Sequence, residues 1–283
     1  MPQNDTADSH AKAMVIASFL GDSLALGAHW IYDTRRIQNE FGRVENLLKP
    51  ADGSFHAGKD KGEFTHYGDQ ALALLESVSA KNGFDLKDFS SRWRGLFENY
   101  RGYFDEATKT TLSNYASGKG VEEAGSPSND LAGAARIPPL VYLYREDLET
   151  LVEAARAQTS MTHRDPITVD CAEFFARVSF DILKGARPVQ AMKKTAKDGF
   201  KGSPIMDWLN AGFDSIGSET VGTVVRFGQS CHTPEAFPGV AHLIAKYEED
   251  LMEALVQSVM AGGDSAGRGM LVGMILGGWT SEP

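Results

Sequence analysis

Three shortages in the sequence exclude whole classes of protein: few cysteines, a deficit of basic residues and no long apolar run. The two cysteines, Cys171 and Cys231, have no C-x-x-C spacing, which argues against a zinc knuckle and a disulfide scaffold. Reduced thiols are typical of a reducing compartment, so we expect a cytoplasmic protein.

Acidic residues outnumber basic ones by 38 to 28, which gives a formal net charge of −10. Nucleic-acid backbones are bound through clustered Lys and Arg, so we expect no general nucleic-acid binding. The apolar runs 14–20 and 270–278 are too short to cross a bilayer, and no targeting segment is visible. We therefore expect no membrane partner, while the oligomeric state stays open.

Alternation of apolar and polar residues, the pattern of a half-buried strand, is also absent. Helical spacing recurs instead, and we predict an all-α, single-domain, compact multi-helix bundle over residues 1–283, with a flexible terminus at 1–10. Loops are expected at 34–63 and 228–238, the first long enough to cover a site. The expected helices cover residues 9–30, 71 onward, two parts of 85–117, 147–157, 167–184, 188–199, 204–215, 219–227, 239–260 and 265 onward.

The most informative stretch begins with Gly262 and Gly263, which permit a tight turn, and continues with Asp264. Glycine then recurs at every fourth position from 269 to 277, and this places the glycines on one stripe of a helix. Such a stripe predicts close packing against another backbone, with Asp264 at the end of a buried helix. Capping and ligand binding both stay open for this acid.

Two further stretches place polar residues where they need partners. Asp22 lies on the apolar face of the first expected helix, so either hydrogen bonds or a site must satisfy it. His29 follows, beside two aromatic residues that line a pocket or close the core. His66 and Asp69 belong to a polar cluster at a helix start, where amides favour anions, although ordinary capping by Asp69 is an alternative.

The middle of the chain offers three more candidates. Asp130 ends a stretch rich in Gly, Ser and Pro, and Arg136 lies in the apolar segment 131–144 that follows. An arginine in such a segment needs a carboxylate or phosphate partner, and we favour an internal salt bridge. His163 precedes a helix that starts at Pro166, as a pocket residue or as a hydrogen-bonded corner.

In their order along the chain, several motifs resemble the ADP-ribosylglycohydrolase family, which includes the J-type lens crystallins. Each motif is weak alone, but the ordered set is fairly specific and spans nearly the whole chain. The resemblance implies an all-α fold and a small-molecule or ADP-ribosylated substrate. The matching motifs are Gly21–Gly27, Tyr67–Leu72, Ala134–Leu140, Thr162–Pro166 and Gly262–Asp264.

Active members of that family typically hold two magnesium ions, or manganese in some cases, between helix ends. The resemblance implies that these ions orient ADP-ribose and activate a water that attacks the anomeric carbon. It assigns Asp69 and Asp264 as catalytic residues and metal ligands, with Asp22 as a further ligand. It assigns substrate contacts to Asp130, Arg136, His163, His66, His29 and Gly263.

The chain departs from the family pattern at the metal ligands. The signature Thr-Asp-Asp-Thr is replaced by residues 67–70, where only Asp69 is acidic, and the second acid of the last signature becomes Ala266. His29 stands where an acid is expected. At most a reduced site remains, with a third ligand from Asp130 or Asp22. Histidines 29, 66 and 163 leave open a softer metal such as zinc or iron.

Three functions therefore compete. The first is metal-assisted hydrolysis of a glycosidic bond in an ADP-ribosyl or related substrate. The second is a catalytically silent, crystallin-type protein with a binding or structural role, because acids are lost from the helix starts. The third is metal-free hydrolysis of another small substrate by His66 and an acid.

Overall fold

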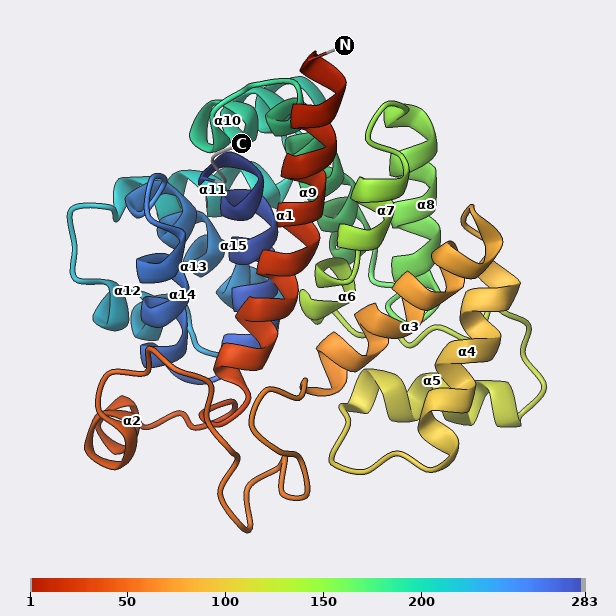
Figure 1. The fold of residues 1–283 in the computed structure, drawn as a ribbon, viewed down its shortest axis with the longest axis horizontal. Coiled ribbons are helices and arrows are strands. Elements are labelled where there is room, and N and C mark those ends of the chain that lie inside the picture. The colour runs from red at the N-terminus through yellow and green to blue at the C-terminus, as the bar shows by residue number, and fades with distance from the viewer. Residues whose placement is uncertain (1, 281–283) are drawn as a thin grey trace.

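The computed structural model describes residues 2–280, with the side chains of 7–280, and the regular secondary structure of this part of the chain is helical, with no strand. The all-α fold is therefore confirmed. Helix α1 (Pro2–Ala25) lies against α15 (Ser265–Thr280) at the centre of the molecule (Figure 1). Helices α3 to α5 lie on one side of this pair and α10 to α14 on the other.

The two central helices touch backbone to backbone. A Cβ atom on Gly21 would lie 2.3 Å from the carbonyl oxygen of Gly269, and one on Gly273 would lie 2.2 Å from that of Ala17. Both distances are far below van der Waals contact, so only glycine permits this approach. The stripe predicted from residues 269–277 thus packs against α1, and it places the start of α15 at the C-terminal end of α1.

The remaining helices surround this pair, and aspartate is the most frequent residue at their starts. Asp33, Asp85 and Asp147 each accept backbone amides of the following helix, which satisfies donors that a helix start leaves open. No helix within residues 2–280 is long and apolar enough to cross a membrane. The surrounding helices are α2 (Thr34–Phe41), α3 (His66–Lys81), α4 (Leu86–Glu98), α5 (Glu106–Ala116), α6 (Ala132–Ala135), α7 (Pro138–Leu143), α8 (Leu148–Ser160), α9 (Pro166–Leu183), α10 (Pro188–Gly199), α11 (Pro204–Asp214), α12 (Thr220–Phe227), α13 (Thr233–Lys246) and α14 (Leu251–Met260).

Some boundaries differ from the expected ones. The stretch 34–63 is not loop throughout, because it contains helix α2. Asp33 caps this helix, and the helix buries the side chain of Ile37. The expected helix 239–260 is two helices, since the chain turns before Asp250, which caps α14. α13 begins inside the expected loop 228–238, and α1 begins before residue 9. Met1 lies outside the described residues, and the flexibility of 1–10 stays a prediction, as does the single-domain organisation.

Candidate functional site

Helix α15 begins after a left-handed turn of Gly262 and Gly263, whose φ angles are 69° and 62°. A Cβ atom on Gly263 would lie 2.2 Å from the carbonyl oxygen of Gln229. The Gly263 amide donates to the Ile31 carbonyl at 2.8 Å, and the Asp264 amide donates to that of Gln229 at 2.8 Å. The turn thereby fixes Asp264 between α15 and the segments that follow α1 and α12.

The Asp264 carboxyl group is buried beside two aromatic rings. Its Oδ1 atom accepts the indole N–H of Trp30 at 3.3 Å and lies 3.5 Å from Nε2 of His29. Burial raises the pKa of Asp264 to about 6, against the opposing charge of Arg268. A carboxyl group that titrates this close to neutrality can hold a proton or a cation, and perturbed groups of this kind gather at functional sites.

His29, where the resemblance implies an acid, caps α15. Its Nδ1 atom accepts the Ala266 amide at 3.2 Å. Burial, with the charges of His56 and His66, holds the pKa of His29 well below its usual range. A neutral imidazole that accepts at Nδ1 carries its proton on Nε2, which faces Asp264. In this arrangement His29 offers no free lone pair to a metal.

Asp22 serves the start of α3. Its carboxylate accepts the Thr65 amide at 2.7 Å, the Thr65 hydroxyl at 2.5 Å and the Gly68 amide at 3.1 Å. Burial raises the pKa of Asp22 to about 6, although the bonds from Thr65 oppose the shift. The sequence allowed two roles for Asp22, a carboxylate satisfied by hydrogen bonds or a site residue, and these bonds agree with the first. The role of Asp22 as a metal ligand stays a prediction.

Asp69, in the first turn of α3, is matched by a cation. Its Oδ2 atom accepts from Lys59 Nζ at 2.6 Å and from the Tyr100 hydroxyl at 2.6 Å. The side chains of Lys59 and Asp69 are only 10% and 15% exposed, so the pair is largely shielded from water. The negative charge of Asp69 is therefore compensated by a direct ion pair, whereas Arg268 acts on Asp264 through its charge and donates its hydrogen bonds to Ser258 and Gly262 instead.

Asp130 lies at the start of α6 and is linked to α3. Its Oδ1 atom accepts the Ala132 amide at 2.8 Å, and its Oδ2 atom accepts the Tyr67 hydroxyl at 3.3 Å. Tyr67 also hydrogen-bonds Asp264, so one hydroxyl joins two buried acids. Burial and the charges of Asp264 and Asp105 raise the pKa of Asp130 well above its usual value.

Asp105 is a site residue that the sequence reasoning missed. It caps α5 by accepting the Thr108 amide at 2.6 Å, and its Oδ2 atom lies 3.2 Å from Nε2 of His66. Burial opposes ionisation, but the hydrogen bond and charge of His66 hold the pKa of Asp105 below its usual range. The only sign of Asp105 in the sequence is an acid directly before a helix. Many aspartates that merely cap a helix occupy such a position, so it does not identify a site residue.

His163 and Arg136 belong to one buried network. The Arg136 guanidinium donates to Gln70 Oε1 at 2.7 Å and also to the Thr162 hydroxyl. That hydroxyl lies 2.8 Å from Nδ1 of His163, so Arg136 orients the imidazole through Thr162. The expected internal salt bridge of Arg136 is wrong, because the oxygens it binds are neutral. Burial and the charge of Arg136 lower the pKa of His163 to about 3.

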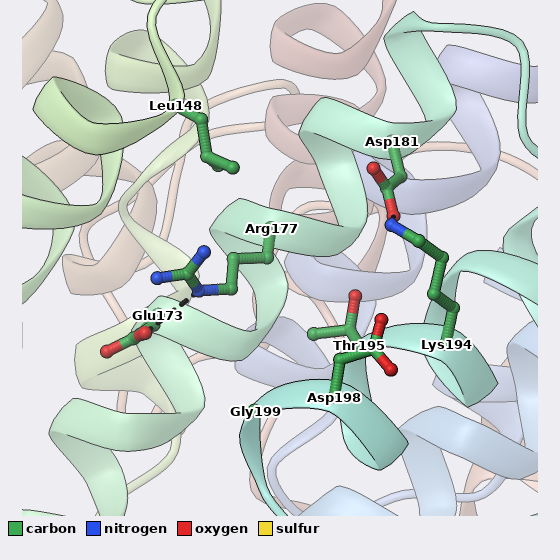
Figure 2. A pocket seen from close by; sticks show the side chains of 8 residues that line it. All are labelled: Leu148, Glu173, Arg177, Asp181, Lys194, Thr195, Asp198 and Gly199. Carbon is green, nitrogen blue, oxygen red and sulfur yellow. Dashed lines mark hydrogen bonds and ion pairs between the residues drawn. The ribbon is translucent and has the colours of Figure 1, made fainter.

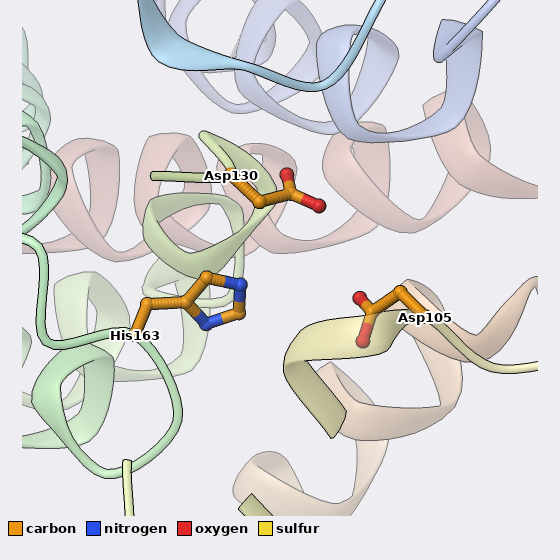
Figure 3. Close-up of side chains that lie close together, drawn as sticks. All are labelled: Asp105, Asp130 and His163. Carbon is orange, nitrogen blue, oxygen red and sulfur yellow. The ribbon is translucent and has the colours of Figure 1, made fainter. Parts of the chain in front are cut away.

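Three of these side chains form what we call the acid–histidine cluster: Asp105, Asp130 and His163. One ligand atom of each lies within 4.8 Å of the others, and Figure 3 shows both carboxyl groups and one imidazole nitrogen facing a common space. The Nε2 atom of His163 has no hydrogen-bond partner among the described residues. The structure thus groups two predicted residues with one that was not predicted.

A second group, the imidazole stack, consists of His29, His56, His66 and Trp30. The ring centroids of His29 and His56 lie 5.2 Å apart, and those of Trp30 and His56 lie 5.4 Å apart. Trp30 adopts a left-handed backbone with φ of 63°, and such strain is typical of functional sites. His56 comes from the long loop after α2, so part of that loop lies against the site as expected.

The side chains do not fit a pair of magnesium ions bridged by carboxylates. Magnesium prefers oxygen ligands in octahedral geometry. Asp69 is paired with Lys59, and His29, Gly68 and Ala266 stand where the family pattern has carboxylates. Among the described residues, the buried acids Asp105 and Asp130 lie with His163 within 4.8 Å of one another, which is close enough to hold one divalent ion.

A surface pocket elsewhere contains none of the predicted site residues. It has a volume of about 310 Å³ and lies between α9 and α10 (Figure 2). Most of its charged side chains are paired, since Arg177 Nε donates to Glu173 and Lys194 Nζ donates to Asp181, each at 2.8 Å. The uncompensated buried acids, and not this pocket, mark the candidate site.

The geometry defines an all-α protein in which acids from several helix starts meet in one buried centre. The sequence matches the family model for ADP-ribosylglycohydrolase over residues 3–281. The chain therefore belongs to the ADP-ribosylglycohydrolase family.

Individual relatives agree with this assignment. Crystallin J1A of Tripedalia cystophora is 24% identical over 95% of this chain and 87% of its own length. An uncharacterised protein of Archaeoglobus fulgidus is 22% identical over 93% of this chain and 85% of its own. A solved structure described as an ADP-ribosylglycohydrolase-related protein complex has a TM-score of 0.72 at 21% identity, covering 97% of this chain and 88% of that one. This last likeness concerns the fold.

Proposed function

We propose that the protein hydrolyses a glycosidic bond of an ADP-ribosyl or related substrate with the help of a divalent cation. The observation that carries the proposal is the meeting of Asp264, Asp130 and Asp105 in one buried centre of a family member. Buried acids without matching cations favour either a bound proton or a bound metal ion. Both are useful for breaking a glycosidic bond.

The acids differ in a way that suits this chemistry. Asp130 and Asp264 have raised pKa values, whereas the pKa of Asp105 is lowered. A glycosidic bond is cleaved through an oxocarbenium-like transition state by one carboxyl group that donates a proton and another that stays ionised. We assign the proton donor to Asp264 or Asp130 and electrostatic stabilisation to Asp105.

The other predicted residues take supporting roles in this proposal. Asp69 and Asp22 hold the first turn of α3, Gly263 shapes the turn before Asp264, and Arg136 orients His163. His163 and the imidazole stack supply substrate contacts, with His29 and His66 as the nearest rings. A bound cation would supply electrophilic help, and magnesium or manganese remains part of the proposal.

The proposal also includes the cellular location and the class of substrate. Cys171 and Cys231 are both free thiols, which is consistent with a cytoplasmic location. The substrate is a small molecule or an ADP-ribosylated molecule, and the negative net charge disfavours general nucleic-acid binding.

A catalytically silent protein is the second candidate. The observation that favours it is the loss of carboxylates at positions 29, 68 and 266, together with the pairing of Asp69 with Lys59. Such a protein would keep a binding or structural role, and crystallin relatives are consistent with this. It would release no ADP-ribose from any substrate.

The test combines binding with turnover. Protein freed of metal by a chelator is titrated with ADP-ribose, with and without magnesium or manganese, while its melting temperature is followed. Release of ADP-ribose from ADP-ribosyl-arginine, ADP-ribosyl-serine and O-acetyl-ADP-ribose is then measured. The proposal expects a metal-dependent shift and turnover of at least one substrate. Binding without turnover favours the silent protein, and turnover that survives chelation favours His66 and Asp105 acting without metal.

A further inference from the structure

The acid–histidine cluster is assembled from three distant parts of the chain. Asp105 precedes α5, Asp130 precedes α6 and His163 lies just before α9, so their local sequences share no metal-binding spacing. The three side chains are at most 10% exposed. Figure 3 shows them pointing toward one another from these segments.

One atom of each side chain is anchored by a short hydrogen bond. The other carboxylate oxygens also have contacts, Asp105 Oδ2 with His66 Nε2 at 3.2 Å and Asp130 Oδ2 with the Tyr67 hydroxyl at 3.3 Å, but each oxygen keeps a second lone pair for a ligand. Asp105 and Asp130 each use Oδ1 to accept a backbone amide, from Thr108 at 2.6 Å and from Ala132 at 2.8 Å. His163 uses Nδ1, 2.8 Å from the Thr162 hydroxyl. When Nδ1 donates to that hydroxyl, Nε2 presents a lone pair to the cluster.

Close packing against the backbone also fixes the position of the His163 imidazole. A Cβ atom on Gly133 would lie 2.6 Å from Cγ of His163, so the backbone of α6 packs directly against the ring. A buried imidazole nitrogen without a partner costs free energy unless a ligand binds it. Two buried carboxylates beside it add negative charge that a divalent cation would neutralise.

We propose that Asp105, Asp130 and His163 bind one divalent transition-metal ion, with zinc as the preferred occupant. A donor set of one nitrogen and two oxygens suits zinc better than magnesium, which prefers oxygen alone. Metal–ligand bonds of about 2.0–2.2 Å place neighbouring ligand atoms roughly 3.3 Å apart, so the 4.8 Å cluster needs only small side-chain movements. Three protein ligands leave a fourth position open for water.

This site shares Asp105, Asp130 and His163 with the proposed hydrolytic centre, but metal binding does not rest on the proposed function, because the site can be occupied in a protein that hydrolyses nothing. It also differs from the metal ligands assigned by family resemblance, which were Asp69, Asp264 and Asp22. Its test is therefore metal binding, measured on the full chain without any substrate.

The test uses protein stripped with a chelator and titrated with Zn²⁺ by calorimetry, with Mg²⁺ as the comparison ion and Co²⁺ as a visible-absorption probe. We expect one equivalent of Zn²⁺ to bind more tightly than Mg²⁺. Asp105→Asn and His163→Ala should each weaken Zn²⁺ binding at least about tenfold, since even indirect contacts to a metal are worth that much. Asp85→Asn, which changes another N-cap aspartate, should bind like the wild type.

Asp105→Asn keeps the cap oxygen for Thr108, so it separates ligand loss from misfolding, and far-ultraviolet circular dichroism checks the fold of each variant. Undiminished stoichiometric binding by folded Asp105→Asn and His163→Ala would overturn the proposal, as would the absence of one-equivalent binding by the wild type. Zinc binding without ADP-ribose release would leave this site standing and remove the proposed hydrolase activity. Magnesium- or manganese-dependent release of ADP-ribose by a chain that binds no zinc would remove this zinc site and leave the proposed hydrolase activity standing.

Discussion

The starts of α3 and α15 carry the two family signatures, but they treat buried negative charge in opposite ways. At α3, Asp22 accepts three hydrogen bonds and Asp69 is paired with Lys59. At α15, Asp264 faces neutral His29 and the indole of Trp30. The pKa values of Asp22 and Asp264 are both raised to about 6, but the acids at α3 are bound by several protein donors and a lysine, whereas Asp264 has hydrogen bonds only from the indole N–H and a hydroxyl among the described residues and can accept a further ligand. A motif therefore indicates where acids stand, while their partners decide what the acids can do.

The largest expected effect contrasts the acids themselves. Asp264→Asn should reduce the release of ADP-ribose about a thousandfold, roughly 4 kcal/mol of lost transition-state stabilisation, because it removes an unmatched carboxyl group. Asp69→Asn should reduce it tenfold or less, because Lys59 already compensates that charge. Steady-state kinetics on both variants measure the difference. Equal losses of ADP-ribose release in Asp264→Asn and Asp69→Asn would show that the two helix starts contribute alike.

Gly263→Ala should disrupt the start of α15 without touching an acid. Its φ of 62° and the 2.2 Å approach to Gln229 combine left-handed strain with a backbone clash. We expect a loss of about 3 kcal/mol in unfolding free energy from urea denaturation. Gly42→Ala is the matched control, since its φ is 67° but no atom lies within 4 Å, and it should cost about 1 kcal/mol. If Gly263→Ala lowers the unfolding free energy no more than Gly42→Ala does, the turn can rearrange to accept a side chain at position 263.

The pH dependence of stability probes Asp22 at the start of α3. Burial raises the pKa of Asp22 from 3.8 to about 6, so the folded state holds a proton that the unfolded chain loses first. Its stabilising contribution is therefore complete below about pH 4 and is lost as the pH rises through about 6. The stability advantage of wild type over Asp22→Asn should shrink by roughly 3 kcal/mol between about pH 4 and pH 7. Chemical denaturation across that range measures it.

The control for this experiment is Asp85→Asn, which alters an exposed cap. Its pH curve should run parallel to that of the wild type. A constant difference between wild type and Asp22→Asn at every pH would mean that Asp22 is ionised throughout, contrary to its burial.

The smallest expected effect comes from Lys59→Met, which would make the start of α3 resemble that of α15. Removing the cation leaves Asp69 with Tyr100 alone and should lower the unfolding free energy by about 1–2 kcal/mol. Lys49→Met, in the same loop, should cost almost nothing, because Lys49 and Asp60 are 3.8 Å apart and exposed. Indistinguishable melting curves for the two variants would show that the ion pair between Lys59 and Asp69 does not stabilise the fold.

What the sequence could predict was local or periodic. The glycine stripe indicated the close packing of α15, and the position of Asp22 on an apolar helix face indicated a satisfied or functional acid. Lys59 and Asp105 could not be assigned, because their partners Asp69 and His66 are separated from them by 10 and 39 residues along the chain. Such pairs depend on how helices and loops pack, and no single-sequence spacing records that packing.

The pairing of α1 with α15 also constrains how the protein is made. The ribosome releases α1 first and α15 last among the described helices, so α1 must wait for its principal partner while the intervening chain is synthesised. Contacts between such distant segments form slowly, because a long loop must close first. Asp264, at the start of α15, can therefore join the other buried acids only after the last described helix has been translated, so the candidate site is incomplete in the nascent chain until then.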